Sequence, residues 1–184
     1  MKKTILSLMA IAIAVLFTAC PVVEKDQEEL LTQKKGWTML TATSDRAYTN
    51  FDGISSENLF VSFFYECELD DILHFDINKS SKMDFGKDIC DDQTGKEVGL
   101  GNWKFKSEKV LEYHLPYFFD DNDNFALLEG AVVVLDETTL TIRVPVEFYD
   151  DPVKGSGKIR NDRGIRNAKG DADKYNFTFT YKAK

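Results

Sequence analysis

The residues best suited to chemistry are an oxygen-rich cluster, a glycine–lysine run and two histidines. Cluster 120–124 (Asp-Asp-Asn-Asp-Asn) has oxygen ligands at alternate positions, as a calcium loop does. Phe125 stands where that loop needs glycine, and Ala131 stands where it needs its last glutamate. We therefore expect a solvated loop between strands, and no metal site.

The Gly-Ser-Gly-Lys run at 155–158 also departs from its motif, the phosphate-binding loop. Pro152 replaces the first glycine, and Ile159 replaces the Ser or Thr that would reach Mg²⁺. His74 and His114 fall at outward positions of predicted strands, and no nucleophile motif accompanies them. The sequence favours a protein that is not an enzyme and uses no cofactor.

The first nineteen residues have the pattern of an export signal. Two lysines open the chain, and the uncharged apolar run 5–17 is shorter than the roughly 20 residues of a membrane-spanning helix. The run is followed by Ala19-Cys20, and small residues before a cysteine resemble a bacterial lipobox, which implies a lipidated Cys20 at the mature N-terminus. We expect a lipoprotein signal peptide at 1–19 and a mature protein anchored through fatty acids such as palmitate. A plain secretory signal is the alternative.

Residues 20–29 after this cysteine form an acidic tether. Lys25-Asp26 followed by further acidic residues resembles the surface-export signal of Bacteroidetes-type lipoproteins. That resemblance implies an outer-membrane protein displayed on the cell surface, with the periplasmic face as the alternative.

With Cys20 lipidated, Cys67 and Cys90 remain as an even pair in an exported protein. A disulfide between them would close a loop of about 24 residues, which the chain-entropy model values at roughly 3 kcal/mol. We expect this disulfide.

Composition limits the class of protein. The 184 residues have a net charge of −8, with 43% hydrophobic and 12% aromatic residues, which suits one domain with a real core. The negative charge argues against nucleic-acid binding, and we expect a monomer.

Eight segments have the composition of strands, and seven of them alternate apolar and polar residues with a period of two. They are residues 37–43, 73–77, 83–85, 102–106, 111–115, 125–135, 140–148 and 175–181. Residues 26–35 and 56–65 have helical signals. The pattern predicts an all-β fold, an eight-stranded antiparallel up-and-down barrel with one or two short helices, or alternatively a β-sandwich. Segment 125–135 is nearly all apolar, so we expect a strand covered on both sides or bulged at Gly130.

The order of several short motifs resembles the lipocalin-like domain of Bacteroidetes lipoproteins. The motifs are Lys35-Gly36-Trp37, residues 66–76, Cys90-Asp91-Asp92, residues 101–105 and residues 136–142. The similarity covers about residues 28–148 and implies a barrel domain, at 30–184, with an apolar cavity.

Two sets of residues are candidates for binding. Aromatic side chains predicted to face the barrel interior would line a ligand cavity: Trp37, Phe75, Trp103, Phe105, Tyr113, Phe177 and Phe179. The glycine-rich loop 152–170 carries six basic residues against one Asp and could recognise a partner through Lys158, Arg160, Arg163 and Arg166. The first set predicts a lipid-anchored barrel that binds a small apolar ligand or a partner. The second predicts a surface adhesin or glycan-binding module.

Overall fold

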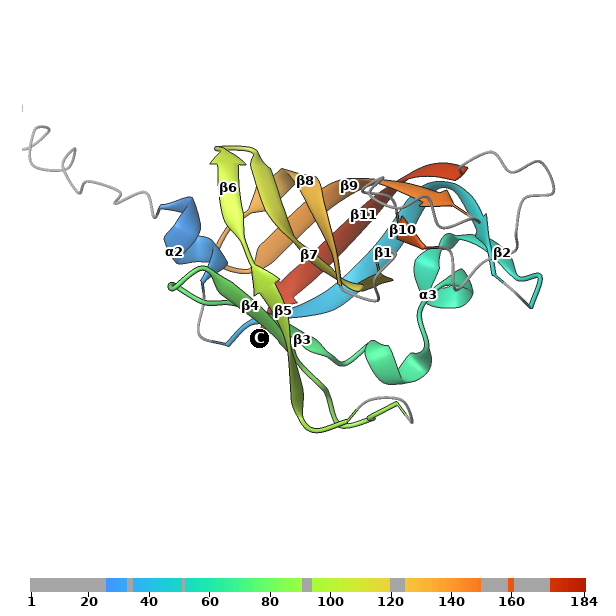
Figure 1. Ribbon diagram of the computed structural model, residues 1–184, viewed down its shortest axis with the longest axis horizontal. Helices are drawn as coiled ribbons and strands as arrows, with labels where there is room; N and C mark the ends of the chain where they lie inside the picture. Colours follow the sequence, from blue (N-terminus) through green and yellow to red (C-terminus); the bar gives the residue numbers. More distant parts are fainter. Residues whose placement is uncertain are drawn as a thin grey trace, which may run out of the picture.

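The chain forms a nearly closed antiparallel β-barrel with short helices at its two ends (Figure 1). The computed structural model describes residues 26–32, 35–50, 52–90, 94–119, 125–149, 159–160 and 173–184. Its elements are α2 (Gln27–Leu31), β1 (Trp37–Thr49), β2 (Ser55–Asn58), α3 (Leu59–Ser62), the 3₁₀ helix η1 (Glu66–Glu68), β3 (Ile72–Phe75), β4 (Ser80–Asp84), β5 (Glu97–Asn102), β6 (Lys104–Ser107), β7 (Val110–Phe119), β8 (Phe125–Leu135), β9 (Thr139–Tyr149), β10 (Ile159–Arg160) and β11 (Asp173–Ala183).

The strands follow one another around the barrel in the order β5-β4-β3-β1-β11-β9-β8-β7-β6. Each pair on this path is antiparallel, and β1 and β11 join the two ends of the chain. The predicted all-β barrel is confirmed, and it is not a sandwich. Among the described residues the main path has nine strands rather than the predicted eight. The predicted strand 102–106 corresponds to β6, which pairs with β7, and the additional strand β5 precedes it and pairs with β4.

The core is built from the inward faces that the alternation predicted. On β9, Leu140, Ile142 and Val144 are fully buried, whereas Arg143 between them is exposed. The neighbouring β11 buries Phe177 and Phe179 in the same way. Because a strand turns alternate side chains to opposite faces, this register places one apolar set inside the barrel.

One end of the barrel is covered by α2. The Trp37 indole Nε1 donates a hydrogen bond to the Leu31 main-chain oxygen at 2.8 Å, and both side chains are fully buried. Gly36, between them, has a φ of 74°, which glycine adopts without steric cost. Helix α2 occupies only part of the predicted 26–35 and lies at the boundary of the expected tether.

The other end is filled by α3 and the residues after it. The Asn58 side chain caps the helix by accepting from the Phe60 N–H at 3.1 Å, so a helix within the predicted segment 56–65 is confirmed. Leu59, Phe63 and Phe64 are buried against the barrel, and Phe63 stacks on Phe118 with ring centroids 4.7 Å apart. The helix is shorter than predicted because residues 55–58 pair with β1 as β2.

Two local expectations were wrong. Ile77 was expected to face inward but is 87% exposed, because β3 ends at Phe75 and the chain turns there. Strand β8 is covered on one side only, and the irregularity in its pairing with β9 lies between Val132 and Val134 rather than at Gly130. Gly130 is needed for close packing instead, since a Cβ there would lie 2.3 Å from Ile142 Cγ2.

Several predicted features lie outside the described residues: the signal peptide 1–19, Cys20, the tether up to residue 25, cluster 120–124, run 155–158, Lys158, Arg163 and Arg166. Of loop 152–170, the structure describes β10, whose backbone runs parallel to the end of β9. Among the described helices, none has the length and apolar character required to cross a bilayer.

Candidate functional site

The seven aromatic residues proposed for a cavity lie together inside the barrel. Six are at most 2% exposed, and Phe105 is partly buried. Their rings contact one another: Phe75 lies 5.8 Å from Trp103 and 6.0 Å from Tyr113, measured between centroids. The rings therefore pack as core, and the pockets described below are lined by other residues.

Two tyrosine hydroxyls are buried in this core, on Tyr113 and Tyr181. Neither finds a hydrogen-bond partner among the described residues. Burial raises the pKa of both hydroxyls, so they remain neutral phenols across the physiological range. An unsatisfied buried hydroxyl costs free energy, so these two do not stabilise the barrel through hydrogen bonding.

Cys67 and Cys90 stand in disulfide geometry, with Cα atoms 5.4 Å apart. Two carboxylates reinforce the same junction: Asp71 Oδ1 accepts from the Gly86 N–H at 2.8 Å, and Asp70 Oδ2 accepts from the Lys87 N–H at 2.7 Å. The corner before β3 is thereby attached to the loop after β4. The motif 66–76 was part of the family resemblance, but its residue pattern did not predict the hydrogen bonds that Asp70 and Asp71 accept.

Tyr117 joins this junction from across the barrel. Its hydroxyl donates to the Asp71 carboxylate and, at 3.4 Å, to the Glu68 main-chain oxygen. Burial, and next the bond to Asp71, raises the pKa of Tyr117. Its backbone φ of 66° is rare for an aromatic residue, and such conformations cluster at functional sites. Pro116 just before it was the available sequence signal, since proline inside a strand indicates a bulge.

An open seam lies between β5 and β7. Strand β6 pairs with β7 only up to Glu112, and no ladder joins β5 to the rest of β7 among the described residues. The His114 ring bounds one end of the seam, because a Cβ on Gly101 would lie 2.5 Å from its Cδ2 atom. Beyond that contact the two strands border a pocket.

We call this the seam pocket; it has a volume of about 490 Å³. Its apolar lining is Met83, Phe85, Val98, Phe119 and Phe125, and the remaining lining residues are Glu68, Thr94, Glu97, Gly99 and Tyr117. Phe119 and Phe125 stack at 5.2 Å. The pocket combines an apolar body with a few polar groups, as small-molecule sites do.

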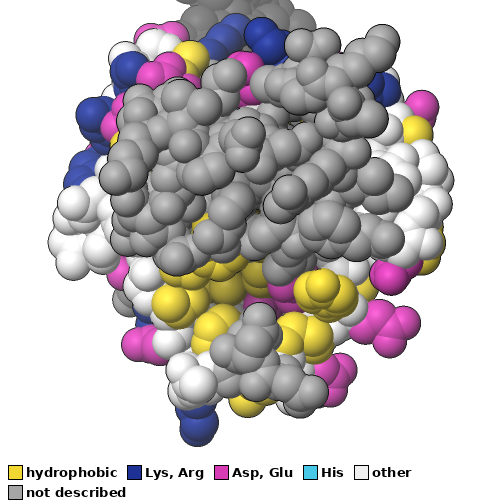
Figure 2. Space-filling model, turned by 45° about the vertical axis from the view of Figure 1, so that its right-hand side comes forward, with side chains coloured by type: hydrophobic (Ala, Val, Ile, Leu, Met, Phe, Trp, Pro, Cys, Tyr) yellow, Lys and Arg dark blue, Asp and Glu magenta, His cyan; other side chains and the backbone are white. Residues whose placement is uncertain are grey.

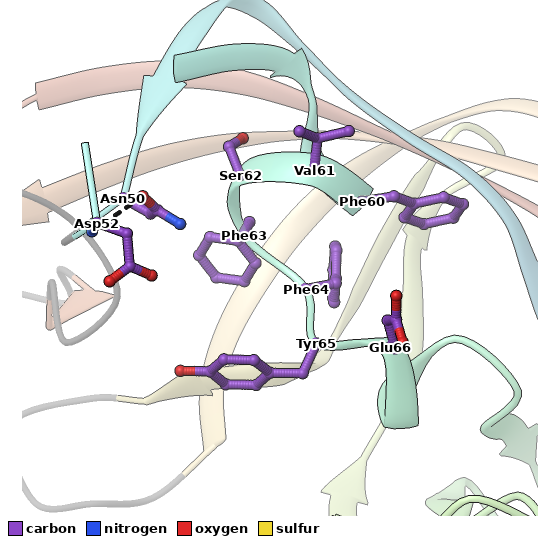
Figure 3. Close-up of a pocket in the computed structure, with 9 residues that line it drawn as sticks. All are labelled: Asn50, Asp52, Phe60, Val61, Ser62, Phe63, Phe64, Tyr65 and Glu66. Carbon is purple, nitrogen blue, oxygen red and sulfur yellow. Dashed lines mark hydrogen bonds between the residues drawn. The ribbon is translucent and has the colours of Figure 1, made fainter. Parts of the chain in front are cut away.

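A second pocket, the α3 pocket, is lined by residues 60–66 with Asn50 and Asp52, and has a volume of about 310 Å³. Figure 3 shows Tyr65 extending below Phe63, and Phe60 pointing to the opposite side. Tyr65 is 62% exposed. Figure 2, which turns this side of the molecule forward, shows hydrophobic side chains gathered in a hollow, with acidic side chains beside them.

A third, polar pocket of about 430 Å³ lies on the outer face of β1, β9 and β11. Asp45 accepts hydrogen bonds there from the backbone and side chain of Asn176, at 2.9 and 2.8 Å, and these bonds lower the pKa of Asp45. Arg143, Thr43 and Thr178 complete the polar surface.

The histidines have strand neighbours as partners. His74 Nε2 lies 3.0 Å from Asp84 Oδ2, and His114 Nδ1 lies 2.8 Å from the Phe125 main-chain oxygen. In the part of the chain that the structure describes, no group of three or more His, Cys, Asp or Glu side chains is arranged to hold a metal ion.

Compared with known proteins, the chain matches no family model, no curated protein and no solved structure. The resemblance to lipocalin-like lipoproteins therefore stays a prediction, supported by sequence motifs and compatible with the barrel topology.

Proposed function

We propose that this protein is a lipid-anchored, non-catalytic barrel of the outer membrane that binds a small apolar molecule in its seam pocket. The observation that carries the proposal is the pocket itself, about 490 Å³ with five apolar side chains in its wall. That volume falls within the range of about 300–1,000 Å³ typical of small-molecule sites.

The seam suits a ligand better than the barrel axis. The axis is filled by aromatic rings in mutual contact, which a ligand would have to displace. At the seam, Val98 and Phe119 belong to two strands that are not hydrogen-bonded to each other. A ligand can therefore contact both apolar side chains without disrupting any backbone hydrogen bond between strands. Covering that surface with a ligand removes it from water, which supplies the binding free energy.

A fluorescence titration with a neutral apolar dye, N-phenyl-1-naphthylamine, tests this function. The wild type is expected to bind the dye, and Val98→Trp, which fills the seam pocket, to weaken binding at least about tenfold. Val61→Trp is the matched control, because it places the same side chain in the α3 pocket. If dye binding is lost in Val61→Trp alone, the dye binds in the α3 pocket instead. If the wild type does not bind the dye, the proposed function is contradicted.

The anchor and the surface position rest on the N-terminal sequence. We propose that Cys20 holds the barrel to the outer membrane and that the domain faces outward, with the periplasmic face as the alternative. Protease added to whole cells is expected to digest the protein; protection of the wild type would favour the periplasmic face.

The second candidate function is a surface adhesin or glycan-binding module. The polar pocket favours it, because Arg143, Asn176 and Asp45 offer hydrogen-bond donors and acceptors of the kind that sugar hydroxyls pair with. Lys158, Arg160, Arg163 and Arg166 of loop 152–170 would add positive charge. Glycan-array binding that is lost in Arg143→Ala but kept in Val98→Trp would establish this function in place of the first.

A further inference from the structure

We propose that the seam pocket selects apolar molecules that carry a positively charged amine. This inference rests on the proposed function and names the chemical class of its ligand. It starts from Glu68, which lines the pocket and is only 5% exposed. Burial strengthens the attraction between a carboxylate and a cation, because less water screens the charge.

Glu68 is fixed in place by the backbone. Its Oε2 atom accepts a hydrogen bond from the Tyr65 N–H at 2.9 Å, and this bond caps helix η1. The carboxylate is therefore oriented before any ligand arrives, which lowers the cost of ordering the site on binding. An ammonium group in the pocket would add a charge-assisted hydrogen bond to this preformed acceptor.

The charge around the pocket has one sign. Of the described residues that line it, Glu68 and Glu97 are charged, and none is Lys, Arg or His. Glu97 stands at the exposed rim, where Lys82 Nζ lies 2.5 Å from its Oε2 atom, so its charge is largely compensated. Buried Asp71 is a further carboxylate, and it accepts a hydrogen bond from the hydroxyl of Tyr117, which lines the pocket. The interior thus favours a cation and disfavours an anion.

The aromatic walls agree with this charge. Phe119 and Phe125 line the pocket as a stacked pair with an interplanar angle of 29°. The face of a phenyl ring attracts a cation through its quadrupole, and the same ring packs against an alkyl chain. Anion binding would gain nothing from these faces.

Displacement of the dye by three amphiphiles with the same twelve-carbon chain tests the inference, with each compound kept below its micelle concentration or its solubility limit. Dodecylammonium is expected to displace the dye at a concentration about tenfold lower than dodecanol, and dodecanoate to be weaker than both. Glu68→Gln keeps the shape of the side chain and an acceptor for the Tyr65 N–H, so η1 keeps its cap. In that variant the amine preference is expected to fall to less than about twofold, because dodecylammonium loses its charged acceptor.

Glu97→Gln is the matched control for general attraction to an acidic protein. It removes the same charge from the rim and is expected to retain most of the preference, whereas Val98→Trp is expected to abolish binding of all three amphiphiles. Equal binding of the three by the wild type, or a full preference in Glu68→Gln, would overturn the head-group inference and leave the proposed function standing. Binding of none would overturn the proposed function itself.

Discussion

The Tyr117 hydroxyl donates a hydrogen bond to the Asp71 carboxylate and so attaches β7 to the corner that precedes β3. The other carboxylate oxygen of Asp71 accepts from the Gly86 N–H, so one buried side chain connects three segments. Tyr117 itself has a left-handed backbone conformation, which an aromatic residue rarely adopts. It also lines the seam pocket between β5 and β7.

This bond predicts opposite outcomes for two buried tyrosines. Tyr117→Phe is expected to lower the free energy of unfolding by about 1–3 kcal/mol, because Asp71 loses a buried donor. Tyr113→Phe is expected to leave stability unchanged or raise it, since its hydroxyl has no partner among the described residues. Urea denaturation of both variants measures the difference; equal losses would contradict the prediction.

The cysteine pair is expected to be oxidised in protein recovered from the cell envelope. Replacing Cys67 and Cys90 with serine should lower the free energy of unfolding by about 2–4 kcal/mol without abolishing folding, because the barrel has its own core. Thiol titration of the domain lacking Cys20, under denaturing and non-reducing conditions, should find no reactive thiol. Two reactive thiols would refute the disulfide.

Two strand glycines, Gly130 on β8 and Gly99 on β5, are expected to respond differently to alanine. Gly130→Ala should destabilise the protein by about 1–3 kcal/mol, because the added Cβ would lie 2.3 Å from Ile142 Cγ2 in a packed core. Gly99→Ala meets nothing within 4 Å and should change stability little. Thermal unfolding of the two variants compares them, and a larger loss for Gly99→Ala would show that the packing argument is wrong.

Asp136 in the β8–β9 turn is expected to titrate at low pH. Its carboxylate accepts from the backbone N–H groups of Thr138 and Thr139, both at 2.8 Å, and these bonds lower its pKa. A depressed pKa stabilises the fold above the unfolded value of about 3.9, and this contribution is lost as pH falls through the lower folded pKa. NMR titration should place the midpoint below about 3.9. In Asp136→Asn, the free energy of unfolding should fall less steeply as the pH is lowered.

Lipidation is expected at Cys20. Metabolic labelling with a palmitate analogue should mark the wild type, whereas Cys20→Ala should remain unlabelled and leave the membrane fraction, because it lacks the modified thiol. Label retained by the variant would exclude this anchor.

Regular strands could be predicted because their signal is local. Leu140, Ile142 and Val144 alternate with polar neighbours, and this period is a direct consequence of the extended backbone. Trp37 and the Cys67–Cys90 pairing were likewise predictable, from the interior face of a strand and from the redox logic of an exported protein. The all-β class and most of the interior residues therefore follow from the amino-acid sequence by itself, whereas the tertiary structure decided between a barrel and a sandwich.

The seam pocket depended on the tertiary structure. Glu68 and Tyr117 are 49 residues apart, and no period relates them. They meet because β7 leaves its alternation at Pro116 and Tyr117, bends under the Asp71 corner and loses its register with β8 between His114 and Phe119. Whether β5 pairs with β7 is likewise decided by closure of the whole sheet. The residues of a strand specify which of its faces is buried, but not which of its edges stays unpaired.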